Sequence, residues 1–287
     1  MKQHAFLITA YRSPDLLNRL LSRYAHTIPC YVHVDRKARM QPEELLQHPN
    51  ICIIKQFRVN WGGINHWLAF LELMKQAAAD GYDYYHLITG QDYVVAPLYD
   101  FDTLMGGISH VNYDWLERGV WNKTLYFDRY NVYRFYDFLN VKNPIWGSHL
   151  WDAGLFLAKV QRHLGINRPM PLPVYAGNGY CSLTHEATCY ILDYLEQHPA
   201  FLRRMRHTFC AEEIMFPTIL MNSPLRDRVS NDNLRFISWE GYQPPRILDE
   251  TDFDELASGK YLFARKIDPL KSARLLQMLD KHLGYNS

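Results

Sequence analysis

Short apolar runs alternate with helical patterns through the first ninety residues of the chain. Four runs are typical of buried strands: 5–10, 31–34, 51–54 and 84–89. After the first run, apolar residues recur every three or four positions, and Ser13 and Pro14 are predicted as the cap and first residue of a helix. The alternation predicts an α/β fold with a mostly parallel sheet flanked by helices. Ligands of such sheets bind at the carboxyl ends of the strands, where Asp35 and Asp92 fall.

The pattern changes after residue 100. Residues 100–175 are rich in Trp, Tyr, Arg and Asn and show little apolar periodicity before Leu150–Leu164, which indicates a loop-rich section over the sheet. Regular patterns return with a run at Val174–Leu183, a helix beginning near Thr184 and another over Glu212–Met221. A last helix is predicted from Asp268-Pro269 to Gly284, with its apolar face formed by Leu270, Ala273, Leu276, Leu279 and Leu283.

No linker, internal repeat or low-complexity segment interrupts the 287 residues. We therefore expect a single domain over 1–287, with a nucleotide-binding half at 1–95 and an acceptor and catalytic half at 96–287.

Composition and charge narrow the class of protein. At 48 % apolar residues the chain can bury a large core, and its net charge of +1 predicts no general attraction to nucleic acid or an anionic membrane. No signal peptide or membrane span is recognisable, and five cysteines without CxxC spacing favour reduced thiols. These features predict a cytoplasmic protein.

Several common catalytic motifs are missing from the sequence. There is no GxGxxG after the first strand, and no GxxxxGK[ST], GxSxG or HExxH, which argues against dinucleotide, P-loop, esterase and zinc-hydrolase chemistry. Two Asp-Phe-Asp triplets, at 100–102 and 252–254, could hold a divalent cation on a nucleotide diphosphate. The first lies well beyond its strand and the second in an acidic segment before a helix, so we expect no metal site.

Two groups of charged residues stand beside apolar segments. Glu212 and Glu213 open an apolar helix, where one carboxylate can interact with the helix dipole and the other can face a cleft as a general base. Arg265 and Lys266 are flanked by apolar residues, and with Arg246 they could neutralise a departing diphosphate.

Taken in order, five motifs resemble one known family. They are Tyr31-Val-His-Val-Asp-Arg-Lys-Ala38, Leu87-Ile-Thr-Gly-Gln-Asp-Tyr93, Gly177-Asn-Gly-Tyr180 with Ser182-Leu-Thr184, Ala211-Glu-Glu213 and Leu262-Phe-Ala-Arg-Lys266. The chain is similar to the core-2/I-branching β-1,6-N-acetylglucosaminyltransferases, a family that also includes the peptide O-xylosyltransferases. The resemblance implies a GT-A-type (Rossmann-like) nucleotide-sugar fold, inversion at the anomeric carbon and catalysis without a metal-binding aspartate pair.

The resemblance also implies roles for individual residues. Glu213 matches the catalytic base, and Arg246 and Lys266 match the cations on the donor diphosphate, with Arg265 competing for that role. The remaining matches and hypotheses form two sets. The donor-binding set is Thr9, Asp35, Asp92, Gly177 and Asn178, and the acceptor-binding set is Trp115, Trp121, Tyr180 and Trp239.

Three departures from the family pattern carry information. The chain shows no membrane anchor, stem or disulfide framework, so it resembles a bacterial, cytoplasmic member that builds surface glycans. Asn178 occupies a position that is often serine in the family. The aromatic and basic section Tyr113–Tyr136, which includes Arg129 and Arg134, has no match in the family pattern. It is our candidate acceptor surface, and the alternative is that its aromatics pack the loop section onto the sheet.

The sequence therefore predicts an inverting, metal-independent glycosyltransferase that transfers a sugar, with GlcNAc as the leading choice, from a UDP-sugar. The acceptor would be a hydroxyl of a polysaccharide or lipid-linked oligosaccharide, with peripheral contact at the inner membrane face as a further hypothesis and no nucleic-acid partner. The alternatives are xylosyltransferase-like use of another UDP-sugar and a sugar-binding protein on a degenerate scaffold. A glycoside hydrolase is a third, but adjacent glutamates seldom face each other across a bond.

Overall fold

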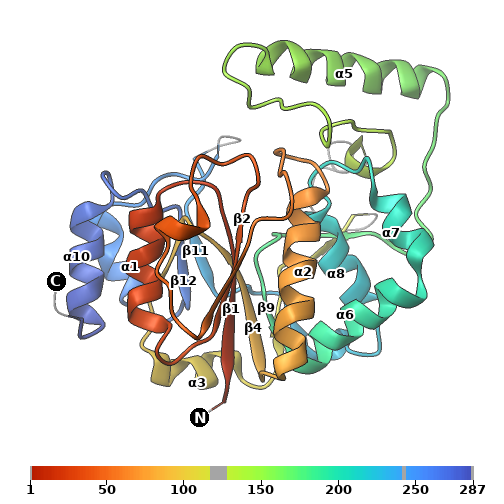
Figure 1. Cartoon of the computed structure of the whole chain (residues 1–287). Helices are drawn as coiled ribbons and strands as arrows, with labels where there is room; N and C mark the ends of the chain where they lie inside the picture. Colours follow the sequence, from red (N-terminus) through yellow and green to blue (C-terminus); the bar gives the residue numbers. More distant parts are fainter. Residues whose placement is uncertain (1, 117–127, 241–243, 286–287) are drawn as a thin grey trace.

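Parallel strands form the centre of the main sheet in the computed structural model, which describes residues 2–116, 128–240 and 244–285 (Figure 1). Within these ranges the strand order is β10-β6-β9-β4-β1-β2-β3. β1 pairs in parallel with both β2 and β4, β2 with β3 and β10 with β6, whereas β9 runs antiparallel to its neighbours β4 and β6. The strands are β1 (His4–Ala10), β2 (Cys30–Val34), β3 (Ile51–Ile54), β4 (Tyr84–Thr89), β6 (Ser109–His110), β9 (Ser182–Thr184) and β10 (Val229–Ser230).

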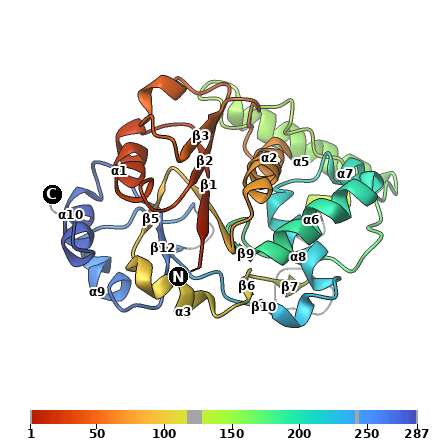
Figure 2. The same ribbon diagram turned by 60° about the horizontal axis from the view of Figure 1, so that its bottom comes forward.

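Helices cover both faces of this sheet because its central strands are apolar on both sides. Successive side chains of β1 alternate between two buried clusters, with Leu7 in one and Phe6 and Ile8 in the other. One face is covered by α2 (Asn65–Asp80), α6 (His185–Gln197) and α8 (Glu212–Met221), and the other by α1 (Pro14–Tyr24) and α3 (Phe101–Met105) (Figures 1 and 2). Strands from both ends of the chain thus share one layered core.

A second sheet joins the C-terminal part of the chain to the end of β4. It contains β11 (Arg235–Ile237), β12 (Phe263–Arg265) and β5 (Asp92–Val94) in the order β11-β12-β5, with Arg265 opposite Asp92. The buried carboxylate of Asp280 on α10 (Ala273–His282) accepts hydrogen bonds from Arg19, Arg23 and Tyr93 and anchors that helix. The remaining elements are β7 (Asp114–Trp115), β8 (Tyr175–Ala176), α5 (Gly147–His163), α7 (Pro199–Met205) and α9 (Phe253–Leu256).

The structure confirms the predicted α/β class with a mostly parallel sheet, and the first four strands lie within two residues of their predicted bounds. Thr184 caps α6 as expected, since its side chain accepts a hydrogen bond from the Ala187 amide at 3.2 Å. Ser13 precedes α1 but its side chain makes no capping bond, because its backbone is left-handed with φ 58°.

Two other expectations need correction. The last helix begins at Ala273 rather than at Pro269, because the Asp268 carboxylate accepts bonds from the amides of Leu270 and Lys271 and closes a turn there. Leu270 is consequently 85 % exposed. The loop-rich section also contributes β6 to the main sheet, where His110 pairs with Ser182.

All five cysteines lie in the described part and carry free thiols. In the described ranges no helix combines the length and apolarity needed to cross a bilayer.

Buried neutral histidines make the fold sensitive to acid. Burial lowers the pKa of His33 to about 4, from an ordinary 6.5, and its Nε2 accepts a hydrogen bond from the Phe57 amide at 2.9 Å. In the unfolded chain this ring takes up a proton near pH 6.5, whereas in the folded chain it does so only near pH 4. The neutral His33 ring therefore contributes fully to stability above pH 6.5, and this contribution is lost as the pH falls toward 4.

We expect His33 alone to lower the free energy of unfolding by on the order of 1–2 kcal/mol between about pH 7.5 and about pH 5, measured by urea unfolding. His33→Asn should shrink that difference, whereas His163→Asn on an exposed site should leave it unchanged. A His33→Asn protein with the full wild-type difference would contradict the prediction.

Candidate active site

The carboxyl end of β4 meets the end of β12 at a buried ion pair. Arg265 Nη1 donates to Asp92 Oδ1 at 2.8 Å and to the Thr89 hydroxyl at 2.6 Å. Asp92 Oδ2 in turn accepts from the Thr89 amide at 2.6 Å. Both charged side chains are largely removed from water, with 14 % and 4 % exposed, so the pair ties the two sheets together at the end where ligands of parallel sheets bind.

Lys266 follows Arg265 in the chain. Unlike Arg265, it is not paired with a carboxylate in the described residues. Within the described residues its ammonium group has no hydrogen-bond or ion-pair partner. Burial, then the positive charges of Arg265 and Arg12, lower its pKa. Arg12 is exposed and lies just after the end of β1. Its position at a strand end is a signal in the sequence, but Arg12 was not predicted as a site residue. We call Arg12, Arg265 and Lys266 the cation half.

The two glutamates at the start of α8 point to different partners. The Glu213 carboxylate accepts a charged hydrogen bond from Arg129, whereas Glu212 Oε1 lies 3.2 Å from His66 Nδ1. This divergence follows from the helix, because adjacent residues project about 100° apart. Glu212, Glu213, His66 and Arg129 are called the carboxylate half below.

The pKa of Glu213 is raised. Burial raises its pKa above the ordinary value, the charge of Arg129 opposes that rise, and the neighbouring charge of Glu212 adds to it. A carboxylate with a raised pKa binds a proton more strongly, which suits a group that must take one from a hydroxyl.

His66 connects the carboxylate half to the end of β1. Its Nε2 lies 3.1 Å from the Thr9 hydroxyl, and its Nδ1 faces Glu212, so the ring joins the two. Sequence reasoning selected Thr9 as a donor-binding residue and missed His66. It placed Arg129 on the candidate acceptor surface but did not pair it with Glu213. His66 lies 146 positions from Glu212, and no spacing rule connects residues so far apart.

Tyr180 lies between the two halves. The Arg265 guanidinium carbon stands 4.4 Å from the centroid of its ring, and the His66 ring centroid is 6.5 Å from it on another side. Burial raises the pKa of Tyr180, Arg265 lowers it, and the charges of Asp92, Glu212 and Glu213 raise it. The Tyr180 ring therefore lies close to both halves.

Gly177 and Asn178 pack beside α8 on the segment that leads to Tyr180. The Gly177 amide donates to the Glu213 carbonyl at 2.7 Å, and a Cβ on Gly177 would lie 1.7 Å from the Asn112 carbonyl oxygen. Asn178 Nδ2 donates to Asn112 Oδ1 at 3.1 Å. In this structure both residues position the segment beneath Glu213.

Asp35 is buried at the end of β2, where its Oδ1 accepts from the amides of Lys37 and Val59 at 3.0 and 3.1 Å. These bonds hold two loops against the strand end. Asp35 and Asp92 thus lie at sheet ends, as predicted.

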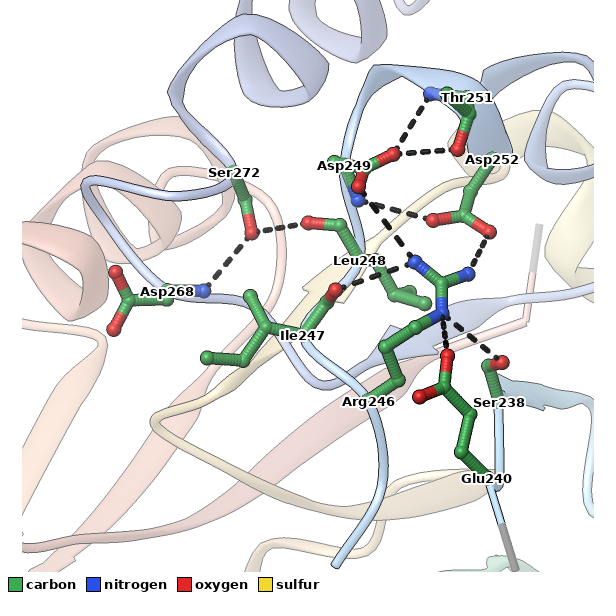
Figure 3. Close-up of polar contacts among 10 residues, drawn as sticks. All are labelled: Ser238, Glu240, Arg246, Ile247, Leu248, Asp249, Thr251, Asp252, Asp268 and Ser272. Carbon is green, nitrogen blue, oxygen red and sulfur yellow. Dashed lines mark hydrogen bonds and ion pairs between the residues drawn. The ribbon is translucent and has the colours of Figure 1, made fainter.

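Arg246 lies near Lys266 through the backbone, but its side chain is engaged elsewhere (Figure 3). The Lys266 amide is 3.4 Å from the Arg246 carbonyl. The guanidinium group, however, binds Asp252 and also lies 3.3 Å from Glu240 and 3.8 Å from Asp249. Three carboxylates therefore compensate its charge, and the structure does not bring it together with the cation half.

The predicted acceptor residues are scattered. The Trp115 ring stacks on Tyr175 at 5.9 Å and packs against the core, as the packing alternative expects. Trp239 is 55 % exposed beyond β11, and Trp121 lies outside the described residues. Arg134 is buried and donates to the Gly154 carbonyl.

The Asp-Phe-Asp triplets lie away from both halves. Asp102 accepts from His4, the first residue of β1, and so marks the opposite edge of the sheet. Asp252 belongs to the group around Arg246. In the described ranges, no three His, Cys, Asp or Glu side chains group closely enough to hold a metal ion.

Comparison with known proteins identifies the family of the chain. No curated protein matches the chain significantly. A family model described as Core-2/I-Branching enzyme matches residues 4–257, which include both glutamates of α8 and Asp92. The matched range covers most of the chain, and the protein therefore belongs to the core-2/I-branching enzyme family of glycosyltransferases, whose fold is GT-A-like.

Proposed function

We propose that this glycosyltransferase transfers a sugar, with GlcNAc as the first candidate, from a UDP-sugar to a glycan hydroxyl with inversion and without a metal. The acceptor would be a growing surface polysaccharide or a lipid-linked oligosaccharide. Residues 1–95 would contribute most of the donor side, and 96–287 the acceptor side and the base. The observation that carries the proposal is Lys266, a half-buried ammonium group without a partner in the described residues, beside two further cations.

The cation half suits a departing diphosphate. Charge grows on the β-phosphate as its bond to the anomeric carbon breaks, and fixed cations in a partly dry site stabilise that charge. Lys266 is available for this contact, whereas Arg265 already donates to Asp92 and Thr89. We therefore assign the direct contact to Lys266 and a supporting role to Arg265. Arg246 keeps only a positioning role in this proposal, since carboxylates surround it.

The carboxylate half suits the acceptor hydroxyl. Glu213 takes the hydroxyl proton while the oxygen forms the new bond to the anomeric carbon, and UDP leaves from the opposite side. Attack from the face opposite the leaving group inverts the configuration. The raised pKa of Glu213 strengthens it as a base, and Arg129 keeps it ionised.

Substituting each glutamate in turn tests which of the two acts as the base. We expect Glu213→Gln to lower kcat by about 10²–10⁴-fold with UDP affinity nearly unchanged, because a general base acts only in the chemical step. Glu212→Gln, the matched control, should cost much less. The measurement is transfer from radiolabelled UDP-GlcNAc, with UDP-xylose in parallel. A reversed order of the two variants would refute the assignment, and UDP-sugar binding without any turnover would favour the sugar-binding alternative.

The pH profile tests the coupling of Arg129 to Glu213. Activity needs the ionised carboxylate, so kcat should fall as the pH drops through the raised pKa of Glu213, above the ordinary glutamate range. Arg129 lowers this pKa, and Arg129→Met should move the acid limb of the profile to higher pH. Arg134→Met, which leaves the Glu213 contact in place, serves as control. An acid limb at the same pH in wild type and Arg129→Met would contradict the coupling.

Removing a cation tests the diphosphate contact. We expect Lys266→Ala to weaken UDP binding about tenfold or more in calorimetry, because a charge-assisted hydrogen bond contributes about 1.5–3 kcal/mol. Arg246→Ala should change UDP affinity less and lower the melting temperature more, since it leaves Asp252 without its partner. EDTA should leave turnover unchanged. Activity lost in EDTA and restored by manganese would overturn the metal-free mechanism.

A further inference from the structure

The helix α5 and its flanks expose an unusual concentration of large apolar side chains. More than half of the exposed large hydrophobic residues in the described part come from residues 138–166. We call this set the α5 surface: Phe138, Ile145, Trp146, Leu155, Phe156, Leu157, Leu164 and Ile166. Figure 1 shows α5 as a separate layer beyond the carboxyl ends of the strands, away from the other helices. Soluble monomers rarely leave such a group uncovered.

Only some of the apolar side chains of α5 attach the helix to the body. Its buried residues are Gly147, Ala158 and Gln161, and Gln161 exchanges two hydrogen bonds of 2.8 and 3.0 Å with the Tyr133 backbone. A cavity of about 100 Å³ remains between the helix and segment 133–139. Trp151 of α5 also stacks on Tyr136 at 5.7 Å between ring centroids. Small, polar and aromatic groups thus attach α5, while Leu155 and Phe156 remain exposed.

The outward side of α5 is divided into an apolar and a basic stripe. With 3.6 residues per turn, Phe156, Val160 and Leu164 fall within one arc of less than about 100°, whereas Ala153 and Leu157 line the cavity at its edge. The adjacent arc carries Lys159, Arg162 and His163 together with Asp152 and Leu155, all of them exposed, and Arg162 is paired with Asp128. This arrangement is typical of a helix that lies in the plane of a lipid interface.

Tryptophan and lysine continue the pattern beyond the helix. Trp146 precedes α5 and is 63 % exposed, and the Lys142 ammonium lies 4.4 Å from the ring centroid of Trp61, which is also exposed. Indole rings and lysine side chains both favour the boundary between acyl chains and headgroups. The net charge of the whole chain is only +1, so an attraction to anionic lipid has to come from such a local group.

We propose that the α5 surface docks the protein on an anionic phospholipid bilayer. The apolar stripe would enter the interface, and Lys142 and Lys159 would lie among the headgroup phosphates, whereas Arg162 is already paired with Asp128.

A series of side-chain contacts connects the neighbourhood of the α5 surface with the carboxylate half. The Trp61 ring contacts Phe209 at 5.1 Å between centroids, and the Arg129 guanidinium lies 5.3 Å from the same Phe209 ring while binding Glu213. A docked enzyme would therefore present Glu213 near the headgroup layer, where a lipid-linked acceptor places its sugar. This last step rests on the proposed function, whereas lipid binding itself does not.

Vesicle flotation with the full chain tests the proposal. Wild type should float with phosphatidylcholine vesicles containing about 30 % phosphatidylglycerol, bind pure phosphatidylcholine more weakly, and detach in high salt. Phe156→Ser with Leu164→Ser should reduce the bound fraction by about tenfold or more, because two apolar side chains that are 70 % and 68 % exposed leave the interface. Tyr99→Ser with Leu270→Ser, two exposed residues elsewhere, is the matched control and should bind as wild type does.

Two further readouts keep the result interpretable. Circular dichroism and melting temperature should not change in the double variant, since both side chains are exposed. Transfer to a water-soluble acceptor should also be unchanged, so loss of docking is distinguishable from failure of the chemistry. Equal flotation of wild type and the α5 variant would overturn the proposal. So would a wild-type dimer in light scattering that the α5 variant abolishes, which would assign the surface to a second copy of the chain.

Discussion

The buried ion pair of Arg265 and Asp92 determines where the rest of the site can lie. Its partners are 173 residues apart in the chain, and their bond holds the end of β12 against the end of β4. Breaking such a pair costs about 3–5 kcal/mol, because a charge is left buried without its partner. The pair therefore fixes the backbone on both sides of it. Lys266 follows Arg265 directly and is held at the sheet edge, while the Arg265 guanidinium lies over Tyr180.

The two halves of the site contain charged groups whose pKa values are shifted in opposite directions. Lys266 has a lowered pKa because it is buried beside other cations, and Glu213 has a raised pKa because it is buried beside another carboxylate. An anion entering the cation half would stabilise the charged form of Lys266, and the excess positive charge thus favours binding of a diphosphate. A proton taken up by Glu213 relieves its repulsion with Glu212. The burial that disfavours the charged form of each group therefore favours one step of the proposed transfer.

Local patterns predicted much of this architecture, and contacts distant in sequence explain what they missed. The strands β1 to β4 were predictable because buried parallel strands need continuous apolar runs. The divergence of Glu212 and Glu213 followed from helix geometry. Their partners His66 and Arg129 lie 146 and 84 residues away, and only the topology brings them to α8. For Arg246 the local contact decides the outcome. Its backbone carbonyl lies beside Lys266, but its side chain binds Asp252, six residues further along the chain.

The helix α5 shows what the spacing of apolar residues cannot predict. The spacing of apolar residues indicates one apolar stripe, yet it carries no information on what covers that stripe. In α1 and α10 the corresponding residues, Leu20 and Leu276, are buried against the body. In α5, Phe156 is 70 % exposed, because Trp151, Ala158 and Gln161 make the contact with the body instead. An exposed phenylalanine adds little packing energy to this fold, so folding stability alone does not account for the stripe, whereas a contact with an apolar surface outside the chain does.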